Sequence, residues 1–184
     1  MLRIIDLVLS VVGLVLTLPI LLVVTLIGYF DTGSPIFIQE RVGRGKRPFK
    51  LIKFRTMSVD TASVASHLAS RSSITKFGAF LRKTKIDELP QLINVVKGEM
   101  SLVGPRPNLF NQAELIEERD KLNVYDALPG VTGLAQVSNI DMSTPELLAK
   151  TDRKMLDSLT VGRYFDYIIA TATGKGAGDR VSKS

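Results

Sequence analysis

The hydrophobic pattern of the chain begins with one long apolar segment. Residues 7–30 (LVLSVVGLVLTLPILLVVTLIGYF) contain no charged side chain. As a helix they would run about 36 Å, enough to cross a hydrocarbon core of about 30 Å. Pro19 lies in the middle, where proline removes one hydrogen bond and clashes with the preceding turn. The segment therefore predicts either a kinked membrane-spanning helix or a re-entrant helix, and the residues alone favour the span.

Alternating apolar positions after this segment predict a β-hairpin over residues 35–54. Two runs rich in Ile, Phe, Val and Leu flank the sequence Gly43-Arg44-Gly45-Lys46, which is typical of a turn. The second run ends with Lys53 and Arg55 on either side of Phe54. On a strand the two cations share one face, as a solvated edge or as a phosphate clamp.

Helical spacing of apolar positions marks four more segments: residues 74–84, 108–124, 145–159 and 164–173. Residues 134–137 are expected to form a short strand. The amphipathic faces of the first and last helices suit the core, a membrane interface or a contact in a homodimer. Residues 60–73, with the surface residue His67, are expected to form a loop, and residues 174–184 a tail. The predicted fold class is α+β, mainly helical.

Composition and charge indicate a protein at a membrane surface. The formal net charge is +6 and the pI about 9.7, yet 45% of residues are hydrophobic and the mean hydropathy is +0.19. The apolar run predicts a membrane-embedded segment at residues 1–31. Cations outnumber acids between residues 31 and 60, which predicts that the domain at 32–184 is cytoplasmic and is attracted to anionic membrane lipids. The sparse aromatic set (four Tyr, eight Phe and no Trp) and the membrane anchor disfavour nucleic acid as a partner. The absence of Cys excludes disulfides and thiolate zinc sites.

The candidate chemistry lies in the stretch IDELPQLINVVKGEMSLVGPRP, residues 86–107. Its apolar spacing predicts a helix that starts near Asp87 as N-cap, with Pro90 in the first turn, and stops at Gly98. Arg106 follows on a turn stiffened by two prolines. Asp87, Glu88 and Arg106 could together hold a metal ion and a phosphate. Taken alone, however, the Asp-Glu pair is more simply explained as a helix cap.

Three blocks of the sequence resemble one known family. They are KFRTM (residues 53–57), DELPQLINVVKGEMSLVGPRP (87–107) and PGVTGLAQV (129–137). In this order and spacing the chain resembles the bacterial sugar transferases, monotopic polyprenol-phosphate phosphoglycosyl transferases, in their minimal form. Such enzymes initiate lipopolysaccharide, capsule and exopolysaccharide synthesis at the cytoplasmic face of the inner membrane.

The resemblance implies a two-step transfer of sugar 1-phosphate from a UDP-sugar to undecaprenyl phosphate. Asp87 would be the nucleophile that forms a covalent phosphosugar intermediate and releases UMP. Asp87 and Glu88 would hold Mg²⁺, while Arg106, Lys53 and Arg55 would bind phosphate. This chemistry agrees with the residue types, because attack on an anionic diphosphate needs charge neutralisation.

The resemblance also implies that the apolar segment is re-entrant and broken at Pro19. Two departures from the family pattern bear on these expectations. Leu18 precedes Pro19 where the family has Ser, and Ser138-Asn139-Ile140 follows the third block where many members have Asn-Gly-Arg. The second departure predicts a different substrate-recognition loop, and the working hypothesis for the sugar is an N-acetylated or 6-deoxy N-acetylated amino sugar carried by UDP. The competing hypothesis is a non-catalytic adaptor that binds anionic lipids through the basic hairpin.

Overall fold

The computed structural model describes residues 2–59 and 73–176; His67, most of the predicted loop and residues 177–184 of the tail lie outside this range. Its helices and strands are, in chain order, α1 (Leu2–Thr32), β1 (Ile36–Val42), η1 (Arg44–Lys46), β2 (Pro48–Phe54), α2 (Lys76–Thr84), η4 (Ile86–Glu88), α3 (Gln91–Lys97), β3 (Ser101–Val103), α4 (Ala113–Lys121), η5 (Val124–Asp126), β4 (Gly130–Thr132), α5 (Leu134–Val137), α6 (Pro145–Asp157) and α7 (Val161–Ala172). The predicted α+β fold, mainly helical, is confirmed.

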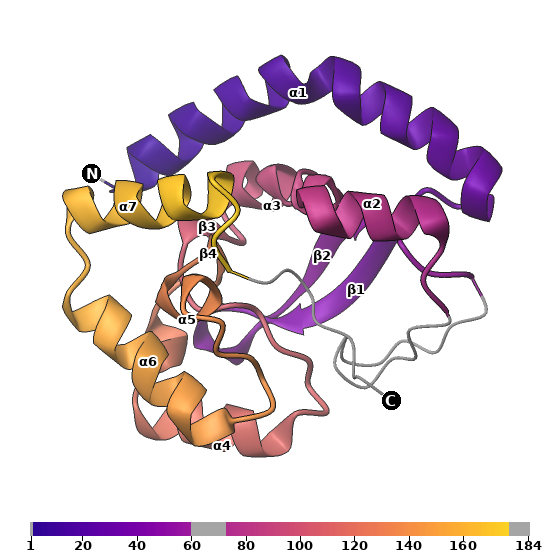
Figure 1. The fold of residues 1–184 in the computed structure, drawn as a ribbon. Helices are drawn as coiled ribbons and strands as arrows, with labels where there is room; N and C mark the ends of the chain where they lie inside the picture. Colours follow the sequence, from indigo (N-terminus) through magenta and orange to yellow (C-terminus); the bar gives the residue numbers. More distant parts are fainter. Residues whose placement is uncertain (1, 60–72, 177–184) are drawn as a thin grey trace.

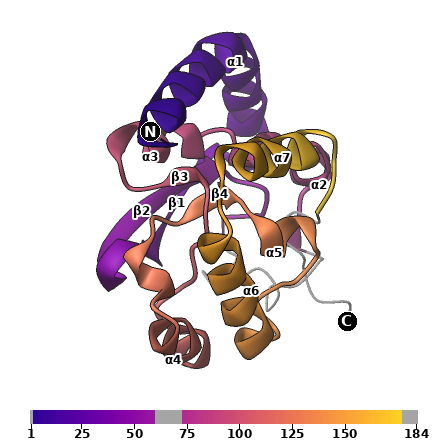
Figure 2. The ribbon, with the colours of Figure 1, turned by 90° about the vertical axis from the view of Figure 1, so that its left-hand side faces the viewer.

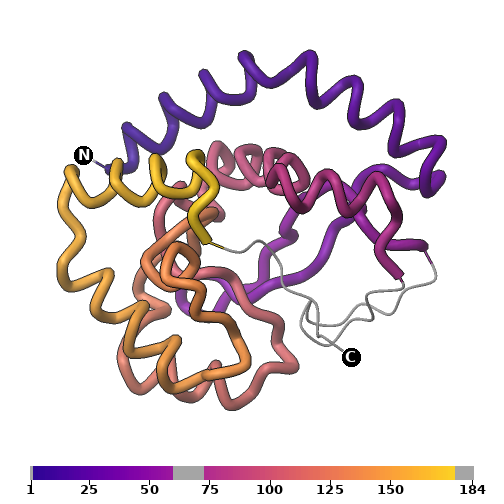
Figure 3. The backbone as a smooth tube through the Cα atoms, in the orientation of Figure 1, coloured from indigo at the N-terminus to yellow at the C-terminus, as the bar shows by residue number. Residues whose placement is uncertain are grey.

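The apolar segment forms one helix, α1, that arches over the rest of the molecule (Figures 1 and 3). By length and composition it could cross a membrane, and only 11% of its most apolar window is buried. Pro19 lies inside this helix, so the expected break into two helices is wrong. One lost hydrogen bond bends a helix without ending it when the residues on both sides remain helical.

Both ends of α1 contact the same globular body. Near the N-terminus, Asp6 is 3% exposed and accepts hydrogen bonds from the Leu102 amide (2.7 Å) and the Tyr164 hydroxyl (2.5 Å). Near the C-terminus, Val24 packs in a cluster with Phe54 of β2 and Leu81 of α2. In the middle of the arch, in contrast, large apolar side chains such as Val15, Leu16 and Leu22 are exposed. A single layer formed by α7, α3 and α2 lies between the arch and the remaining elements (Figures 1 and 2).

The predicted β-hairpin is confirmed. Strands β1 and β2 pair antiparallel from Ile36 opposite Phe54 to Val42 opposite Pro48. The Gly43–Lys46 turn closes them through the short helix η1, in which Gly45 has φ 62°. That conformation is accessible to glycine without steric cost.

A second, two-stranded parallel sheet joins the second and third sequence blocks. β3 pairs with β4 so that Ser101 lies opposite Gly130 and Val103 opposite Thr132. At its end the Gly104 and Gly130 backbones touch: a Cβ on Gly130 would lie 2.0 Å from the Gly104 nitrogen. The strand expected at residues 134–137 is wrong, because this segment forms α5 and the strand lies immediately before it.

Other helix boundaries differ from the sequence-based expectation in detail. The helix expected over 108–124 is confined to α4, because Asn108 and its neighbours are held by contacts with β1 instead. The helix α6 begins at Pro145 with Thr144 as N-cap, as predicted, although the Thr144 side chain makes no capping hydrogen bond. Gly98 ends α3 in the left-handed conformation (φ 87°), also as predicted.

Candidate active site

The two adjacent carboxylates lie on a tight turn that precedes α3. Asp87 and Glu88 belong to η4 and are 3% and 8% exposed. The predicted N-cap role of Asp87 is therefore wrong: α3 begins at Gln91, with Pro90 as its N-cap. Lys85 ends α2 in the left-handed conformation (φ 57°), and Pro90 has no amide hydrogen to donate, so the intervening turn closes through i→i+3 bonds.

Arg106 lies beside this turn. Its Nη2 donates to Glu88 Oε1 at 2.7 Å, and the two side chains are 23% and 10% exposed. A partly buried, charge-assisted hydrogen bond of this kind fixes both groups more firmly than a surface ion pair does. Glu88 and Arg106, which are 18 residues apart in the chain, are thus brought together as the sequence predicts.

The backbone that carries Arg106 is held at three successive carbonyls. The Arg106 carbonyl accepts from Arg119 Nη1 (2.9 Å), that of Pro107 from Arg41 Nη1 (3.2 Å), and that of Asn108 from the Val42 amide (2.9 Å). These donors come from α4 and β1, so the turn is anchored from two sides. Arg119 and Arg41 were not among the residues singled out from the sequence.

The two cations at the end of β2 lie against one aromatic ring. Lys53 Nζ is 5.6 Å and the Arg55 guanidinium carbon 5.2 Å from the centroid of the Phe37 ring. The prediction that both cations share one face of the strand is therefore confirmed. Arg55 Nε also donates to the Ser34 carbonyl at 2.9 Å. Strand β2 itself packs against η4, which carries Asp87 and Glu88.

Arg82 and Lys85 are two further cations near the carboxylates. The sequence gives no sign of a role at the site for them, because they resemble the polar face of an amphipathic helix. Arg82 Nε donates to Thr56 Oγ1 at 2.8 Å, which links α2 to the KFRTM block. Lys85 Nζ donates to the Lys175 carbonyl at 2.8 Å. Burial lowers the pKa of Lys85, an effect that the nearby Glu88 carboxylate partly offsets.

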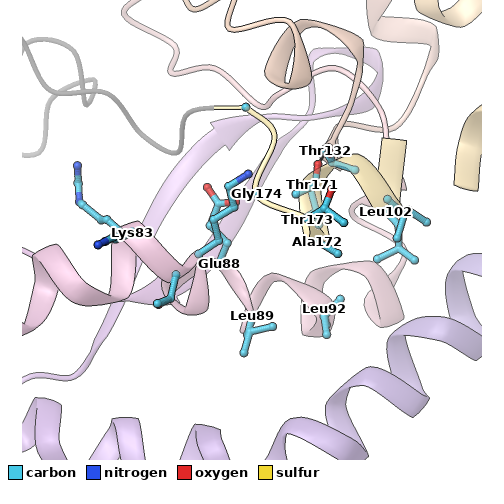
Figure 4. Close-up of a pocket in the computed structure, with 16 residues that line it drawn as sticks. Lys83, Glu88, Leu89, Leu92, Leu102, Thr132, Thr171, Ala172, Thr173 and Gly174 are labelled. Atoms are coloured by element: carbon cyan, nitrogen blue, oxygen red, sulfur yellow. Dashed lines mark hydrogen bonds between the residues drawn. The ribbon is translucent and has the colours of Figure 1, made fainter. Parts of the chain in front are cut away.

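A cavity of about 830 Å³ opens between the η4 turn and α7 (Figure 4). Its lining residues are Arg82, Lys83, Thr84, Lys85, Glu88, Leu89, Leu92, Leu102, Val131, Thr132, Ile168, Thr171, Ala172, Thr173, Gly174 and Gly176. The charged side chains of Lys83 and Glu88 lie at one end, and Leu89 and Leu92 line the side that faces α1 (Figure 4). At the other end, the hydroxyl side chains of Thr132, Thr171 and Thr173 lie beside Leu102. Leu92 lies against α1, since a Cβ on Gly13 would be 3.1 Å from it. The cavity can thus accept a ligand that has an anionic part and an apolar part.

The carboxylate pair suits Mg²⁺ in its chemistry. Mg²⁺ takes oxygen ligands and is commonly held by one or two carboxylates together with substrate phosphates. Asp87 and Glu88 supply two such carboxylates, and Glu88 lies on the cavity wall. Within residues 2–59 and 73–176 there is no group of three or more His, Cys, Asp or Glu residues arranged to hold a metal, so the remaining ligands would have to come from substrate or water.

The sequence as a whole matches the family described as bacterial sugar transferase over residues 1–175. The chain belongs to the bacterial sugar transferase family. The family match covers all three sequence blocks, the apolar segment and α7.

Relatives with assigned names support this placement. The chain is 44% identical over 108 residues to a putative undecaprenyl-phosphate N-acetylgalactosaminyl 1-phosphate transferase of Bacillus subtilis, with 57% of this chain and 60% of that protein covered. It is 43% identical over 154 residues to a UDP-galactose-lipid carrier transferase of Erwinia amylovora (74% and 32% covered). It is 36% identical over 158 residues to a UDP-glucose:undecaprenyl-phosphate glucose-1-phosphate transferase of Xanthomonas campestris (83% and 33%). The chain thus spans between a third and three-fifths of the length of these relatives.

Proposed function

We propose that this protein transfers a sugar 1-phosphate from a UDP-sugar to undecaprenyl phosphate and releases UMP. The observation that carries the proposal is the Glu88–Arg106 pair next to a cavity whose leucine-lined side lies against α1. One substrate is an anionic, water-soluble diphosphate and the other is a lipid phosphate. A cavity with a charged end and a leucine-lined side suits both. The names of the relatives quoted above support the same pair of substrates.

In the first step, a carboxylate oxygen of Asp87 attacks the β-phosphorus of the UDP-sugar. A bond forms between this oxygen and phosphorus, and the bond from phosphorus to the α–β bridging oxygen breaks, so UMP leaves with the electron pair. In the second step, a phosphate oxygen of undecaprenyl phosphate attacks the same phosphorus and displaces the Asp87 carboxylate. The product is an undecaprenyl diphosphosugar, and the enzyme is regenerated.

The roles of the cationic side chains follow from the charge of the substrates. Arg106, with its backbone fixed, would bind phosphate oxygens and stabilise charge that develops during attack. Lys53 at the end of the neighbouring β2, Arg55 just after it, and Arg82 and Lys85 on the cavity wall would add positive potential to the same region. Mg²⁺, held by Asp87 and Glu88, would supply neutralisation of the diphosphate charge.

We propose further that α1 is a re-entrant membrane helix and that residues 32–184 are cytoplasmic. A helix that crosses the bilayer completely has its two ends on opposite faces, about 30 Å apart. Here Asp6 at one end and Val24 toward the other both contact one globular body, while the apolar middle of the arch is exposed. This arrangement supports entry and exit at one face, so that α7 and α2 lie at the membrane interface beside lipid head groups.

The proposed identity of the sugar is based on the names of the relatives. The names of the relatives include N-acetylgalactosamine, galactose and glucose, and the Bacillus subtilis protein named for N-acetylgalactosamine is 44% identical over 108 residues. This similarity supports an N-acetylated amino sugar. The test is UMP release across a panel of UDP-sugars, each with and without undecaprenyl phosphate and Mg²⁺. Release of UMP from none of them would contradict the proposed function.

A further inference from the structure

A buried ion pair lies behind Arg106 and takes no direct part in the chemistry proposed above. Arg119 of α4 and Asp152 of α6 are 1% and 0% exposed. Asp152 Oδ2 accepts from Arg119 Nε at 3.0 Å and from Nη2 at 2.7 Å. The remaining nitrogen, Nη1, faces the Arg106 turn, where it donates to the Arg106 carbonyl and to Asn108 Oδ1, both at 2.9 Å. One guanidinium therefore joins two helices to the turn.

The energetics of this pair argue against stability as its purpose. Moving two charges out of water is costly, and apolar residues of similar volume in place of a buried ion pair are often neutral or stabilising. The second carboxylate oxygen of Asp152, Oδ1, is buried without a hydrogen-bond partner among the described residues. Burial also raises the pKa of Asp152, and Arg119 opposes that rise. A pair selected for stability alone would be expected to have both oxygens satisfied.

The geometry of the Arg119–Asp152 pair indicates a positioning role instead. A guanidinium is planar and rigid, so two hydrogen bonds to Asp152 fix the direction in which Nη1 points. That nitrogen fixes the Arg106 carbonyl. The accepting side chain of Asn108 is itself held by the Tyr125 hydroxyl at 3.0 Å. Arg119, Asp152, Asn108 and Tyr125 are buried, and this chain of contacts ends on the half-buried Arg106, whose side chain reaches Glu88.

We infer that Arg119, oriented by Asp152, is a positioning residue that fixes Arg106 for binding of the substrate phosphate. The inference rests on the proposed role of Arg106. Lysine at position 119 carries the same charge but lacks the fork of donors that bridges Asp152 and the Arg106 carbonyl. The arrangement therefore depends on the shape of the guanidinium as well as on its charge.

Three variants separate positioning from stability. Arg119→Lys and Asp152→Asn break the pair, whereas the double variant Arg119→Met/Asp152→Leu replaces it with apolar side chains of similar volume. Each is purified at full length, melted by circular dichroism and assayed for the KM and kcat of UMP release. The double variant is expected to melt near the wild-type temperature yet to show a KM for the UDP-sugar raised about tenfold or more, because one oriented phosphate contact is lost. A wild-type KM in a double variant of restored stability would overturn the inference.

A double-mutant cycle tests the link to Arg106 directly. In an Arg106→Ala background, Asp152→Asn is expected to change the KM by less than about twofold, since the side chain to be positioned is gone. A full tenfold effect in that background would show that the pair acts elsewhere. Leu115→Ala is the matched control: Leu115 is 1% exposed and packs with Leu148 between the same two helices. It should lower the melting temperature while the KM stays within about twofold.

The outcomes distinguish this inference from the proposed function. If the wild-type protein releases no UMP from any UDP-sugar, the proposed function fails and the inference fails with it. If the wild type is active but Arg106→Ala leaves the KM unchanged, the role of Arg106 is wrong, and positioning it has no consequence. If Arg106→Ala is impaired while Arg119→Met/Asp152→Leu is normal, only the positioning role is refuted.

Discussion

Arg106 Nη2 donates to Glu88 Oε1 at 2.7 Å, and this contact joins the two ends of the central sequence block. Glu88 sits on the short turn before α3, and Arg106 on the turn after β3. A carboxylate proposed to hold a metal ion and a guanidinium proposed to hold a phosphate are thus already adjacent. Without substrate they neutralise each other, and the incoming diphosphate would compete for the guanidinium.

The first prediction concerns this carboxylate. Glu88→Gln keeps the shape and an oxygen acceptor but removes the charge, so the Mg²⁺ concentration needed for half-maximal UMP release should rise about 10- to 100-fold. Glu117→Gln, on an exposed side chain of α4 paired with Lys121, is the control and should leave the Mg²⁺ dependence unchanged. An unaltered Mg²⁺ dependence in Glu88→Gln would exclude Glu88 as a ligand.

Lys85 leads to a prediction about pH. Burial lowers the pKa of Lys85, so this side chain loses its charge at a lower pH than an exposed lysine does. If the cation helps to bind the diphosphate, the KM for the UDP-sugar should rise as pH increases through that lowered value. Lys85→Arg should move this rise to higher pH, because arginine remains charged. Lys97→Arg, on the exposed side of α3, should leave the pH profile of the KM where it is.

The contact between the second and third sequence blocks predicts a folding defect. A Cβ at Gly130 would lie 2.0 Å from the Gly104 nitrogen, a backbone atom that is held by its hydrogen bond to the Thr132 carbonyl at 2.9 Å. Gly130→Ala should therefore destabilise the protein by more than about 3 kcal/mol, or prevent folding. Gly162→Ala, in α7, would place its Cβ in ordinary van der Waals contact with Thr160 Oγ1 at 3.9 Å and should change stability by less than about 1 kcal/mol. Melting followed by circular dichroism compares the two variants.

The membrane topology predicts a labelling pattern. The chain contains no cysteine, so Leu2→Cys and Ser34→Cys each introduce a unique thiol, one at the start of α1 and the other just after its end. A re-entrant helix leaves both thiols inaccessible to an impermeant maleimide added to intact cells, and both accessible in inside-out vesicles. Labelling of position 2 in intact cells would show instead that α1 spans the membrane.

Elements with a strong local signal could be predicted from the sequence. The hairpin was found because its alternation and its Gly43–Lys46 turn agree, and the end of α3 because Gly98 adopts the left-handed conformation that the pattern required. The resemblance identified Asp87, Glu88 and Arg106, and the structure brings the last two into contact.

The other features of the fold and the site depend on tertiary contacts, which leave no local signal in the sequence. The left-handed conformation of Lys85 is unusual for a lysine and converts an expected helix start into the η4 turn. Residues 134–137 are too few for their period to be read, and packing against α6 and α7 makes them helical. Arg119 and Asp152 meet only because α4 lies beside α6, and nothing in either segment predicts that pairing.

The nucleophile is the centre of the proposed mechanism, and its covalent intermediate can be observed directly. The protein is incubated with its UDP-sugar and Mg²⁺ but without undecaprenyl phosphate, then digested and analysed by peptide mass spectrometry while released UMP is quantified. The account predicts a burst of about one UMP per enzyme and a phosphosugar adduct on the peptide that contains Asp87, with both absent in Asp87→Asn. UMP release that requires the lipid acceptor and proceeds without any adduct, or an active Asp87→Asn variant, would contradict it.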